Sequence, residues 1–354
     1  MPLVNKLCNF EDPLFIYTMN LSTLPLFYLY LLFGLSIMAI WIAGIKITKA
    51  IDAIITHYNL GEAFGGMVFL SIVTNLPEIA ITAVAAYHRD YDIAISNILG
   101  GIAIQTVVLV LIDIFGVGRN APLTQKGHSK ILLVEGIAVI LILGVVIWGS
   151  QNSTSNLYFR TTPYEWLILA IWLGTIYLST KWIPKSKPKL RFPKSTFKGT
   201  TKEAIVVLSV GAMITLFAGW ALEVSGEALA TEWGMSGILF GGTILALCTA
   251  LPEISTGIAS AKIKDYNMAV SDIFGGNAFL PVLFLMASII GGDAILPNLK
   301  NSDIYLTVLG MLLTFVYMVG MLIHSKRQIG RMGIDSFIVL ILYLLGLWGL
   351  FTIV

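Results

Sequence analysis

Two glutamates, Glu78 and Glu253, each stand inside a long apolar stretch of the sequence, where a charged side chain is expensive and usually functional. A threonine precedes each glutamate by four residues, Thr74 in the first stretch and Thr249 in the second. Residues four apart share one face of a helix, so each stretch offers a carboxylate and a hydroxyl together. These are the hard oxygen ligands that calcium and sodium prefer. The pattern predicts cation binding at membrane depth.

The two glutamates belong to a duplicated segment. Residues 74–103 read TNLPEIAITAVAAYHRDYDIAISNILGGIA, and residues 249–278 read TALPEISTGIASAKIKDYNMAVSDIFGGNA. Fourteen of the thirty positions are identical without a gap, at a constant offset of 175 residues. The recurrence of the same acid with the same flanking threonine argues against an incidental position for either glutamate.

A proline directly precedes each glutamate. Pro77 and Pro252 have no amide hydrogen, so the carbonyls of Val73 and Cys248, four residues earlier, lose their helical partners. Free carbonyls at membrane depth are tolerated only where protein, water or an ion satisfies them. The alternative is that the prolines only kink their helices and the glutamates are protonated. The recurrence favours cation binding, because a buried charge costs about 2.5–3.5 kcal/mol on insertion scales and two facing carboxylates also repel each other.

The second half of each copy adds further polar side chains. Asp272 is the remaining acid in the core of either copy, and it is expected either to bind the cation or to cap the start of its helix. The glycine pairs Gly100-Gly101 and Gly275-Gly276 permit close approach between helices. Four amides complete the candidate cation ligands: Asn75, Asn97, Gln105 and Asn277.

The composition is that of an integral membrane protein. Of the 354 residues, 57% are hydrophobic and 12% are charged, and the mean hydropathy is +0.86, whereas an ordinary soluble domain has about 25% charged residues. Two cysteines, Cys8 and Cys248, do not provide a disulfide framework. No histidine or cysteine cluster indicates a softer metal, and no cofactor is expected. The histidines fall at loops or helix ends and are expected to be solvated: His57, His88, His128 and His324.

Ten stretches are long and apolar enough to cross a membrane, which takes about 20 residues. They predict an all-α membrane protein with helices at about 24–43, 62–87, 91–115, 131–149, 164–180, 203–223, 235–261, 266–290, 304–324 and 336–353. Five helices separate the two copies, so the copies enter the membrane from opposite sides, and inverted repeats of this kind bind their substrate at the midplane. Four parts are predicted. Residues 1–23 form an N-terminal extracytoplasmic segment, residues 24–180 the first five-helix repeat, residues 181–202 a basic cytoplasmic linker and residues 203–354 the second five-helix repeat.

Lysine and arginine residues predict the orientation of these helices. An N-terminus outside the cell places 18 of the 22 basic residues in inner loops, as the positive-inside rule requires. The linker 181–202 carries eight of them and no acid, and it is expected to face anionic lipid at the cytoplasmic surface. Nucleic acid binding is not expected, because these charges lie on one short loop between membrane helices. The expected location is the cell membrane.

The two copies resemble the alpha-repeats of the calcium/cation antiporter superfamily, the sodium/calcium exchanger family. The family signatures have the forms G-T-S-L-P-E and G-N-x-x-G-S-N. The matching stretches here are V-T-N-L-P-E and C-T-A-L-P-E, followed by S-N-I-L-G-G-I and S-D-I-F-G-G-N. The resemblance implies ten helices in two inverted halves. It also implies that Glu78 and Glu253 coordinate calcium, with Thr74 and Thr249 as supporting oxygens.

The sequence departs from the family at positions that help to hold sodium in sodium-coupled members. Four serines of the family motifs are replaced, by Asn75, Ala250, Gly101 and Gly276. A polar residue that the family places 27 positions after each glutamate is Gln105 in the first copy but Leu280 in the second. The resemblance thus implies a conserved divalent core with depleted sodium sites. Asp272 and Asn277 could compensate from nearby faces, and proton coupling through a carboxylate is equally open.

The expected function is secondary active antiport, in which calcium or a similar divalent cation is exchanged for sodium or protons by alternating access. The alternative is a non-transporting, ion-binding or ion-sensing membrane protein derived from an exchanger, because the missing serines and Leu280 weaken the family pattern. An enzyme is not expected. An intramembrane hydrolase would need an aspartate pair, a Ser-His dyad or an H-E-x-x-H helix, and none of these stands at membrane depth in the sequence.

Overall fold

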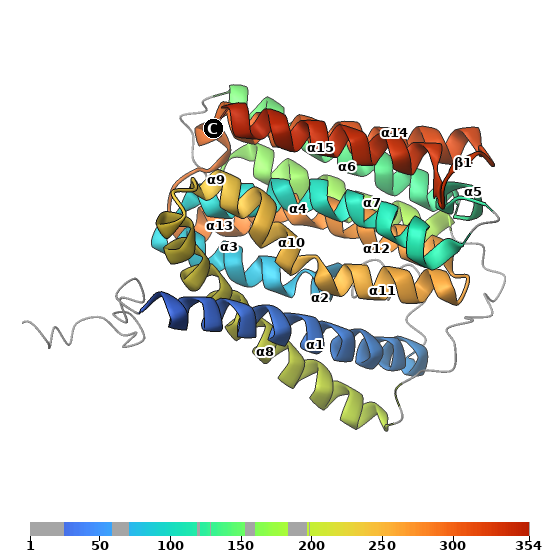
Figure 1. The fold of residues 1–354 in the computed structure, drawn as a ribbon, viewed down its shortest axis with the longest axis horizontal. Helices are drawn as coiled ribbons and strands as arrows, with labels where there is room; N and C mark the ends of the chain where they lie inside the picture. Colours follow the sequence, from blue (N-terminus) through green and yellow to red (C-terminus); the bar gives the residue numbers. More distant parts are fainter. Residues whose placement is uncertain are drawn as a thin grey trace, which may run out of the picture.

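The computed structural model describes residues 25–58, 71–118, 121–127, 129–152, 160–182, 197 and 199–353. Within these residues the chain is almost entirely helical, and the long helices run side by side along one axis (Figure 1). A short antiparallel hairpin of β1 (Gln328–Ile329) and β2 (Met332–Gly333) joins two of the described helices. The predicted N-terminal segment 1–23, most of the basic linker 181–202 and His128 lie outside the described residues.

The described helices fall into two sets separated by the linker. The first set consists of α1 (Leu26–Tyr58), α2 (Ser71–Thr74), α3 (Leu76–His88), α4 (Tyr91–Ile112), the π-helical η3 (Asp113–Val117), α5 (Leu123–Lys126), α6 (Lys130–Gln151) and α7 (Pro163–Trp182). The second set consists of α8 (Thr201–Glu232), α9 (Gly237–Leu239), the π-helical η4 (Phe240–Leu245), α10 (Ala246–Thr249), α11 (Leu251–Lys262), α12 (Tyr266–Phe279), the 3-10 turn η5 (Leu280–Val282), α13 (Leu283–Gly291), the 3-10 turn η6 (Leu296–Asn298), α14 (Asn301–Ile323) and α15 (Ile334–Ile353).

Most of the predicted spanning segments are present as helices. In the described part, seven helices are long and apolar enough to cross a membrane, and the pair Gly237–Thr249 and Leu251–Lys262, bent by 43°, makes an eighth span. The predicted segment 164–180 corresponds to α7, and the end of the predicted segment 62–87 corresponds to α2 and α3. Residues 62–70 lie outside the described part, so the count of ten spanning helices stays a prediction.

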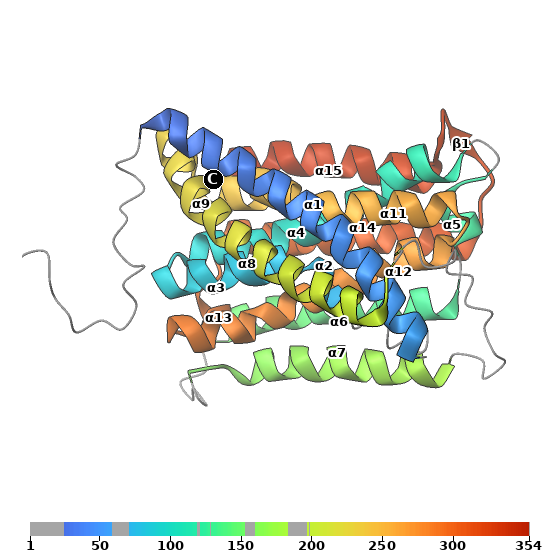
Figure 2. The same ribbon diagram turned by 90° about the horizontal axis from the view of Figure 1, so that it is seen from below.

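Two helices are longer than the sequence predicted. The prediction ended them near residues 43 and 223, but α1 continues to Tyr58 and α8 continues to Glu232. Both helices lie obliquely across the others (Figure 2). A tilted helix needs more residues to cross the same thickness of bilayer, which explains the extra turns.

The turns that follow the two glutamate-bearing helices have the same local structure. Arg89, after α3, and Lys264, after α11, both adopt a left-handed conformation, with φ of 62° and 69°. The next residue in each copy, Asp90 or Asp265, caps the following helix by accepting a hydrogen bond from a backbone amide three residues later. All four residues obey the offset of 175, so the sequence duplication extends to the backbone.

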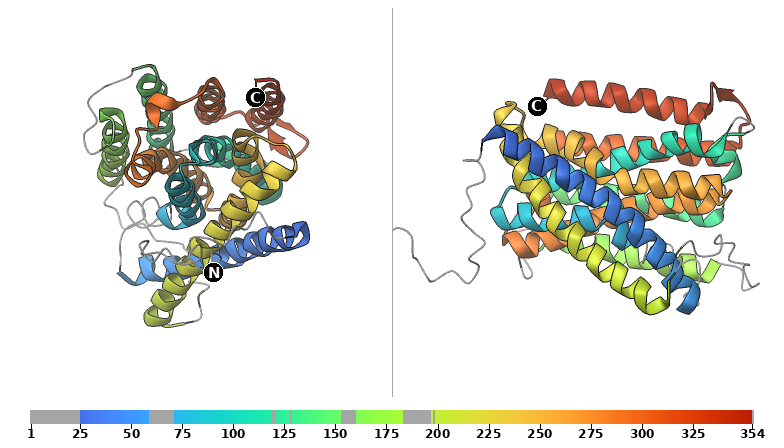
Figure 3. Two further views of the ribbon diagram at one scale, coloured as in Figure 1. Left: turned by 90° about the vertical axis from the view of Figure 1, so that its left-hand side faces the viewer. Right: turned by 60° about the horizontal axis from the view of Figure 1, so that its bottom comes forward.

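The helices α1 and α8 pack against each other in a layer of their own on one side of the bundle (Figures 1 and 3). Each helix contacts the broken helix of the opposite half through a glycine. A Cβ at Gly44 would lie 2.8 Å from two side-chain carbons of Pro252, and a Cβ at Gly219 would lie 2.7 Å from the Cβ of Ala80 and 3.2 Å from the carbonyl oxygen of Pro77. Gly44 and Gly219 are again 175 residues apart, so the two contacts are reciprocal.

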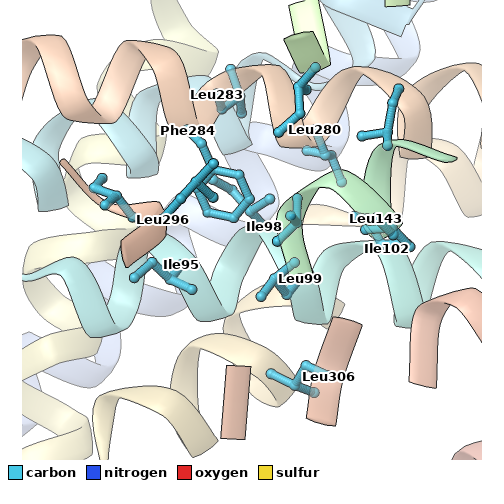
Figure 4. Close-up of a cluster of buried hydrophobic side chains, with 14 of the residues drawn as sticks. Ile95, Ile98, Leu99, Ile102, Leu143, Leu280, Leu283, Phe284, Leu296 and Leu306 are labelled. Carbon is cyan, nitrogen blue, oxygen red and sulfur yellow. The ribbon is translucent and has the colours of Figure 1, made fainter. Parts of the chain in front are cut away.

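The largest apolar core surrounds α4 and joins both halves of the chain. Figure 4 shows the isoleucine and leucine side chains of α4 against Leu280, Leu283 and Phe284 of the second half. On another side of α4, the backbone of Gly100 touches η4 so closely that a Cβ would lie 2.5 Å from the carbonyl oxygen of Gly242. The core therefore holds α4 and the second half together without room for a side chain at this point.

Candidate cation site

The structure breaks both glutamate-bearing helices one turn before the acid, as the prolines predicted. The first break is at Asn75, between α2 and α3, and the second is at Ala250, between α10 and α11. Glu78 and Glu253 therefore lie in the first turn of the helix that follows each break. At this position a carboxylate lies at the amide end of its own helix, where a negative charge is favourable.

The two glutamates lie near each other and are fully buried. Glu78 is 0% exposed and Glu253 is 1% exposed, and the Glu78 carboxylate contributes to the electrostatic environment of Glu253. Thr249 and Gln105 face the Glu78 carboxylate, and Thr74 faces the Glu253 carboxylate. Both oxygens of both carboxylates are nevertheless without a hydrogen bond of normal geometry among the described residues. Each predicted threonine thus faces the glutamate of the other copy.

Asp272 lies beside this pair and does not cap a helix. The start of α12 is capped by Asp265, so the capping interpretation of Asp272 is wrong. Asp272 is buried in the middle of α12, where one carboxylate oxygen accepts a hydrogen bond of 2.9 Å from the hydroxyl of Thr256. Within the described part of the chain its other oxygen has no hydrogen bond, and its charge acts on Glu253. Thr256 is a residue that the sequence analysis missed, although it lies three positions after Glu253.

The four predicted amides are all buried, and three of them take part in side-chain hydrogen bonds. The Gln105 amide donates to the Asn75 side-chain oxygen over 3.2 Å, and the Asn277 amide donates to the Thr106 hydroxyl over 3.0 Å. Among the residues that the structure describes, the carbonyl oxygens of Gln105 and Asn277 have no hydrogen bond, and neither has any polar atom of the Asn97 side chain. The buried interior thus contains further amide oxygens without a hydrogen bond. One of them belongs to Gln105, whose side chain faces Glu78.

The departures from the family motifs have a spatial explanation. A Cβ at Gly276 would lie 3.1 Å from the side chains of both Asn75 and Gln105, so the missing side chain makes room for this amide pair. A Cβ at Gly101 would lie 3.3 Å from Leu280, which occupies the equivalent space in the other copy. The two copies are therefore alike at the glutamates but different beside them, where one has amides and the other has a leucine.

Three other buried acids outside the repeats accept hydrogen bonds from side chains or backbone amides. Glu135 of α6 accepts a hydrogen bond of 2.8 Å from the hydroxyl of Ser271, the residue before Asp272. The second oxygen of Glu135 has no hydrogen bond among the described residues. Glu165 accepts from the Ser288 hydroxyl and from a backbone amide at the start of its own helix. Asp113 is held by three donors: the Leu123 amide, the Gly333 amide and the Ser336 hydroxyl. Their positions in the fold could not be deduced from the repeat pattern.

Helices broken at the same motif in two copies, with unsatisfied carboxylates between them, are characteristic of secondary transporters. The fold and the site place the chain among membrane transporters of cations. The family model described as sodium/calcium exchanger protein matches residues 28–181 and 203–352, so the chain belongs to that family. This is a family of exchangers rather than of enzymes, in agreement with the sequence analysis.

Among curated proteins, the chain is similar to two bacterial membrane proteins. It is 26% identical over 224 residues to the inner membrane protein YrbG of Escherichia coli (strain K12), and the match covers 62% of this chain and 66% of YrbG, slightly less than two thirds. It is 24% identical over 258 residues to the putative antiporter CaxA of Alkalimonas amylolytica, and the match covers 71% of this chain and 76% of CaxA.

Solved structures of exchangers have the same fold. The sodium-calcium exchanger NCX_Mj, soaked with sodium and strontium, matches with a TM-score of 0.60 at 17% identity, over 92% of this chain and 99% of NCX_Mj. The H+/Ca2+ exchanger CAX matches with a TM-score of 0.62 at 14% identity, over 92% of this chain and 88% of CAX. At these identities the likeness establishes the fold, and this fold occurs in exchangers with different counter-cations.

Proposed function

We propose that this chain is a secondary active antiporter that exchanges calcium, or a similar divalent cation, for sodium or protons. The observation that carries the proposal is the pair of buried carboxylates, Glu78 and Glu253, whose four oxygens have no hydrogen bond of normal geometry among the described residues. An uncompensated charge in the membrane interior costs several kcal/mol, and two facing carboxylates add their mutual repulsion. A divalent cation between them offsets both costs.

The ligand chemistry also fits calcium. Calcium takes six to eight oxygen ligands. The proposed site offers the carboxylates of Glu78 and Glu253, the hydroxyls of Thr74 and Thr249 that face them, and the carbonyl oxygens released at the two helix breaks. Asp272, Asn75, Gln105, Asn97 and Asn277 are the further candidate ligands, of which Asp272 and Gln105 face the two glutamates.

Exchange follows from the charge of the empty site. Without a cation, the unpaired carboxylates oppose the rearrangement that exposes the site to the other side of the membrane. Binding of a divalent cation, or of sodium ions or protons, removes this barrier, and each type of cation then returns in the opposite direction. The reciprocal packing of α1 and α8 on the two broken helices is consistent with two halves that move against each other.

The orientation proposed for the chain has the N-terminus outside. In the described part, α1 begins and α15 ends at the same end of the bundle (Figure 1). The opposite end carries the basic residues that flank the helices, including Lys126, Lys130, Lys262, Lys264 and the group Lys326, Arg327 and Arg331. The positive-inside rule assigns this end to the cytoplasm.

The proposal is tested by calcium flux in proteoliposomes with an imposed sodium or proton gradient. Glu253→Gln should abolish flux, because the amide removes one of the two charges that hold the divalent cation. Glu165→Gln is the matched control, since Glu165 is equally buried but its carboxylate is hydrogen-bonded away from the pair. Unchanged flux in Glu253→Gln would refute the central role of the pair. Calcium-dependent thermal stabilisation without any flux would favour the non-transporting alternative.

A further inference from the structure

A second group of potential metal ligands lies between α3 and α8, at the end of the bundle where α1 begins (Figure 2). It consists of His88, the last residue of α3, and Glu223 and Glu227 of α8. One ligand atom from each of the three side chains lies within 4.8 Å of the other two. The sequence analysis expected His88 to be merely solvated, but its Nδ1 lies 3.9 Å from the Oε1 of Glu223.

This group is separate from the proposed transport site. His88 is ten residues after Glu78 on the same helix, which is about 15 Å along the axis. The two glutamates of the group are four residues apart and share one face of α8, so both carboxylates can reach the same point. Asp90, in the turn after α3, also faces all three side chains and adds negative charge.

Glu223 is the feature that an ordinary surface ion pair does not explain. It is 0% exposed, and neither of its carboxylate oxygens has a hydrogen bond among the described residues. The separation of 3.9 Å from the imidazole exceeds the 2.7–3.2 Å of a hydrogen bond to nitrogen. A protonated His88 forms an ion pair with Glu223 at this distance but leaves both carboxylate oxygens without a hydrogen bond among the described residues. A metal ion held by the three side chains would bind these oxygens directly and compensate the buried charge.

We propose that His88, Glu223 and Glu227 form a second metal site, for zinc or a similar transition-metal ion, that bridges α3 and α8. One imidazole with two carboxylates is a donor set that suits zinc better than calcium, which takes oxygen ligands. Bonds of about 2.0–2.2 Å place tetrahedral ligands about 3.4 Å apart. The ligand atoms lie within 4.8 Å of one another, so the exposed side chains of His88 and Glu227 have to move by up to about 1.4 Å toward the buried Glu223 to reach this spacing.

Zinc binding tests this site independently of the proposed transport function. The double variant Glu78→Gln/Glu253→Gln lacks the transport carboxylates, so calorimetric titration of the purified full chain with zinc then measures the second site. One zinc ion per chain is expected, with weaker binding of calcium. His88→Ala and Glu227→Gln, each added to this background, should weaken zinc binding by at least about tenfold, since even residues that only orient metal ligands contribute this much. Glu232→Gln, an exposed acid at the end of the same helix, should leave it unchanged.

Two further measurements make the result decisive. Zinc should raise the melting temperature of the double variant but not of its His88→Ala derivative, because the ion ties two helices together only in the folded state. Zinc X-ray absorption should show a mixed nitrogen and oxygen shell. Absence of zinc binding in the double variant, or unchanged affinity after both His88→Ala and Glu227→Gln, would overturn the assignment. Both ligands are exposed, so these variants are expected to fold, and the melting curve without zinc verifies this.

Discussion

Gly100→Ala should destabilise the protein more than any other single added methyl group considered for this fold. The new Cβ would lie 2.5 Å from the carbonyl oxygen and 2.7 Å from the carbonyl carbon of Gly242, both of them backbone atoms. An ordinary contact is about 3.5 Å, so α4 and η4 must separate by about 1 Å. Overpacking of this kind costs about 1–3 kcal/mol. We expect the upper end of this range, because no flexible side chain can yield.

Two neighbouring substitutions serve as controls for the same chemical change. Gly101→Ala places its Cβ 3.3 Å from the end of the Leu280 side chain, which can shift by a few tenths of an ångström, so a nearly neutral effect is expected. Gly144→Ala, on α6, meets nothing within 4 Å. It should stabilise its helix by about 0.5–1 kcal/mol, since alanine restricts the unfolded chain more than glycine does.

The assay is thermal unfolding of the three variants in the same detergent. The measured quantity is the fraction of protein that remains monodisperse after heating to each temperature. A loss of about 3 kcal/mol corresponds to a fall of roughly 5–10 °C in melting temperature. The expected order is Gly144→Ala highest, Gly101→Ala near the wild type and Gly100→Ala lowest. If Gly100→Ala has the melting temperature of the wild type, the close backbone contact between α4 and η4 is wrong. The conclusion that this contact holds the two halves together would then be wrong as well.

Three further predictions follow from contacts described above. Gly44→Ala and Gly219→Ala should each lower the free energy of unfolding by a similar amount, about 1–2 kcal/mol, and a large fall in melting temperature from only one of them would contradict the reciprocal packing. Asp113→Asn should cost about 1–3 kcal/mol in thermal unfolding, because its amide nitrogen cannot accept the hydrogen bonds that a carboxylate oxygen accepts; a wild-type melting curve would show that these bonds contribute little. Leu280→Gln should increase the dependence of calcium flux on sodium at constant pH, and unchanged sodium dependence would refute the interpretation that the leucine fills a polar pocket.

The sequence predicted the features that depend on local chemistry. Pro77 and Pro252 remove helical hydrogen bonds wherever they stand, so the breaks near Asn75 and Ala250 could be predicted without the fold. The duplication likewise predicted that both acids would occur in equivalent local structures. Apolar length predicted where helices occur, but it did not predict the extent of α1, because tilt depends on packing against other helices.

Features that depend on contacts between distant segments could not be predicted. The bond from Thr256 to Asp272 joins residues of two successive helices, so neither helix alone predicts it. The capping interpretation of the aspartate was wrong because the start of α12 is capped by Asp265. The approach of His88 to Glu223 requires α3 to pack against α8, although the two residues are 135 positions apart. The sequence pattern contained the histidine and the acids, but only the reciprocal packing of the two halves brings them together.

The unequal surroundings of the two glutamates have a consequence for coupling. An inverted repeat with identical copies would offer two equivalent pockets beside the central pair, and each could hold one counter-cation. Here the pocket beside Gly276 contains the amides of Asn75 and Gln105, whereas Leu280 fills the equivalent space beside Gly101. A leucine offers no ligand to sodium and no site for a proton. In the proposed antiport cycle the counter-cations would therefore bind asymmetrically, on the amide side or on the central carboxylates themselves, while the divalent cation would meet acids from equivalent positions of the two copies.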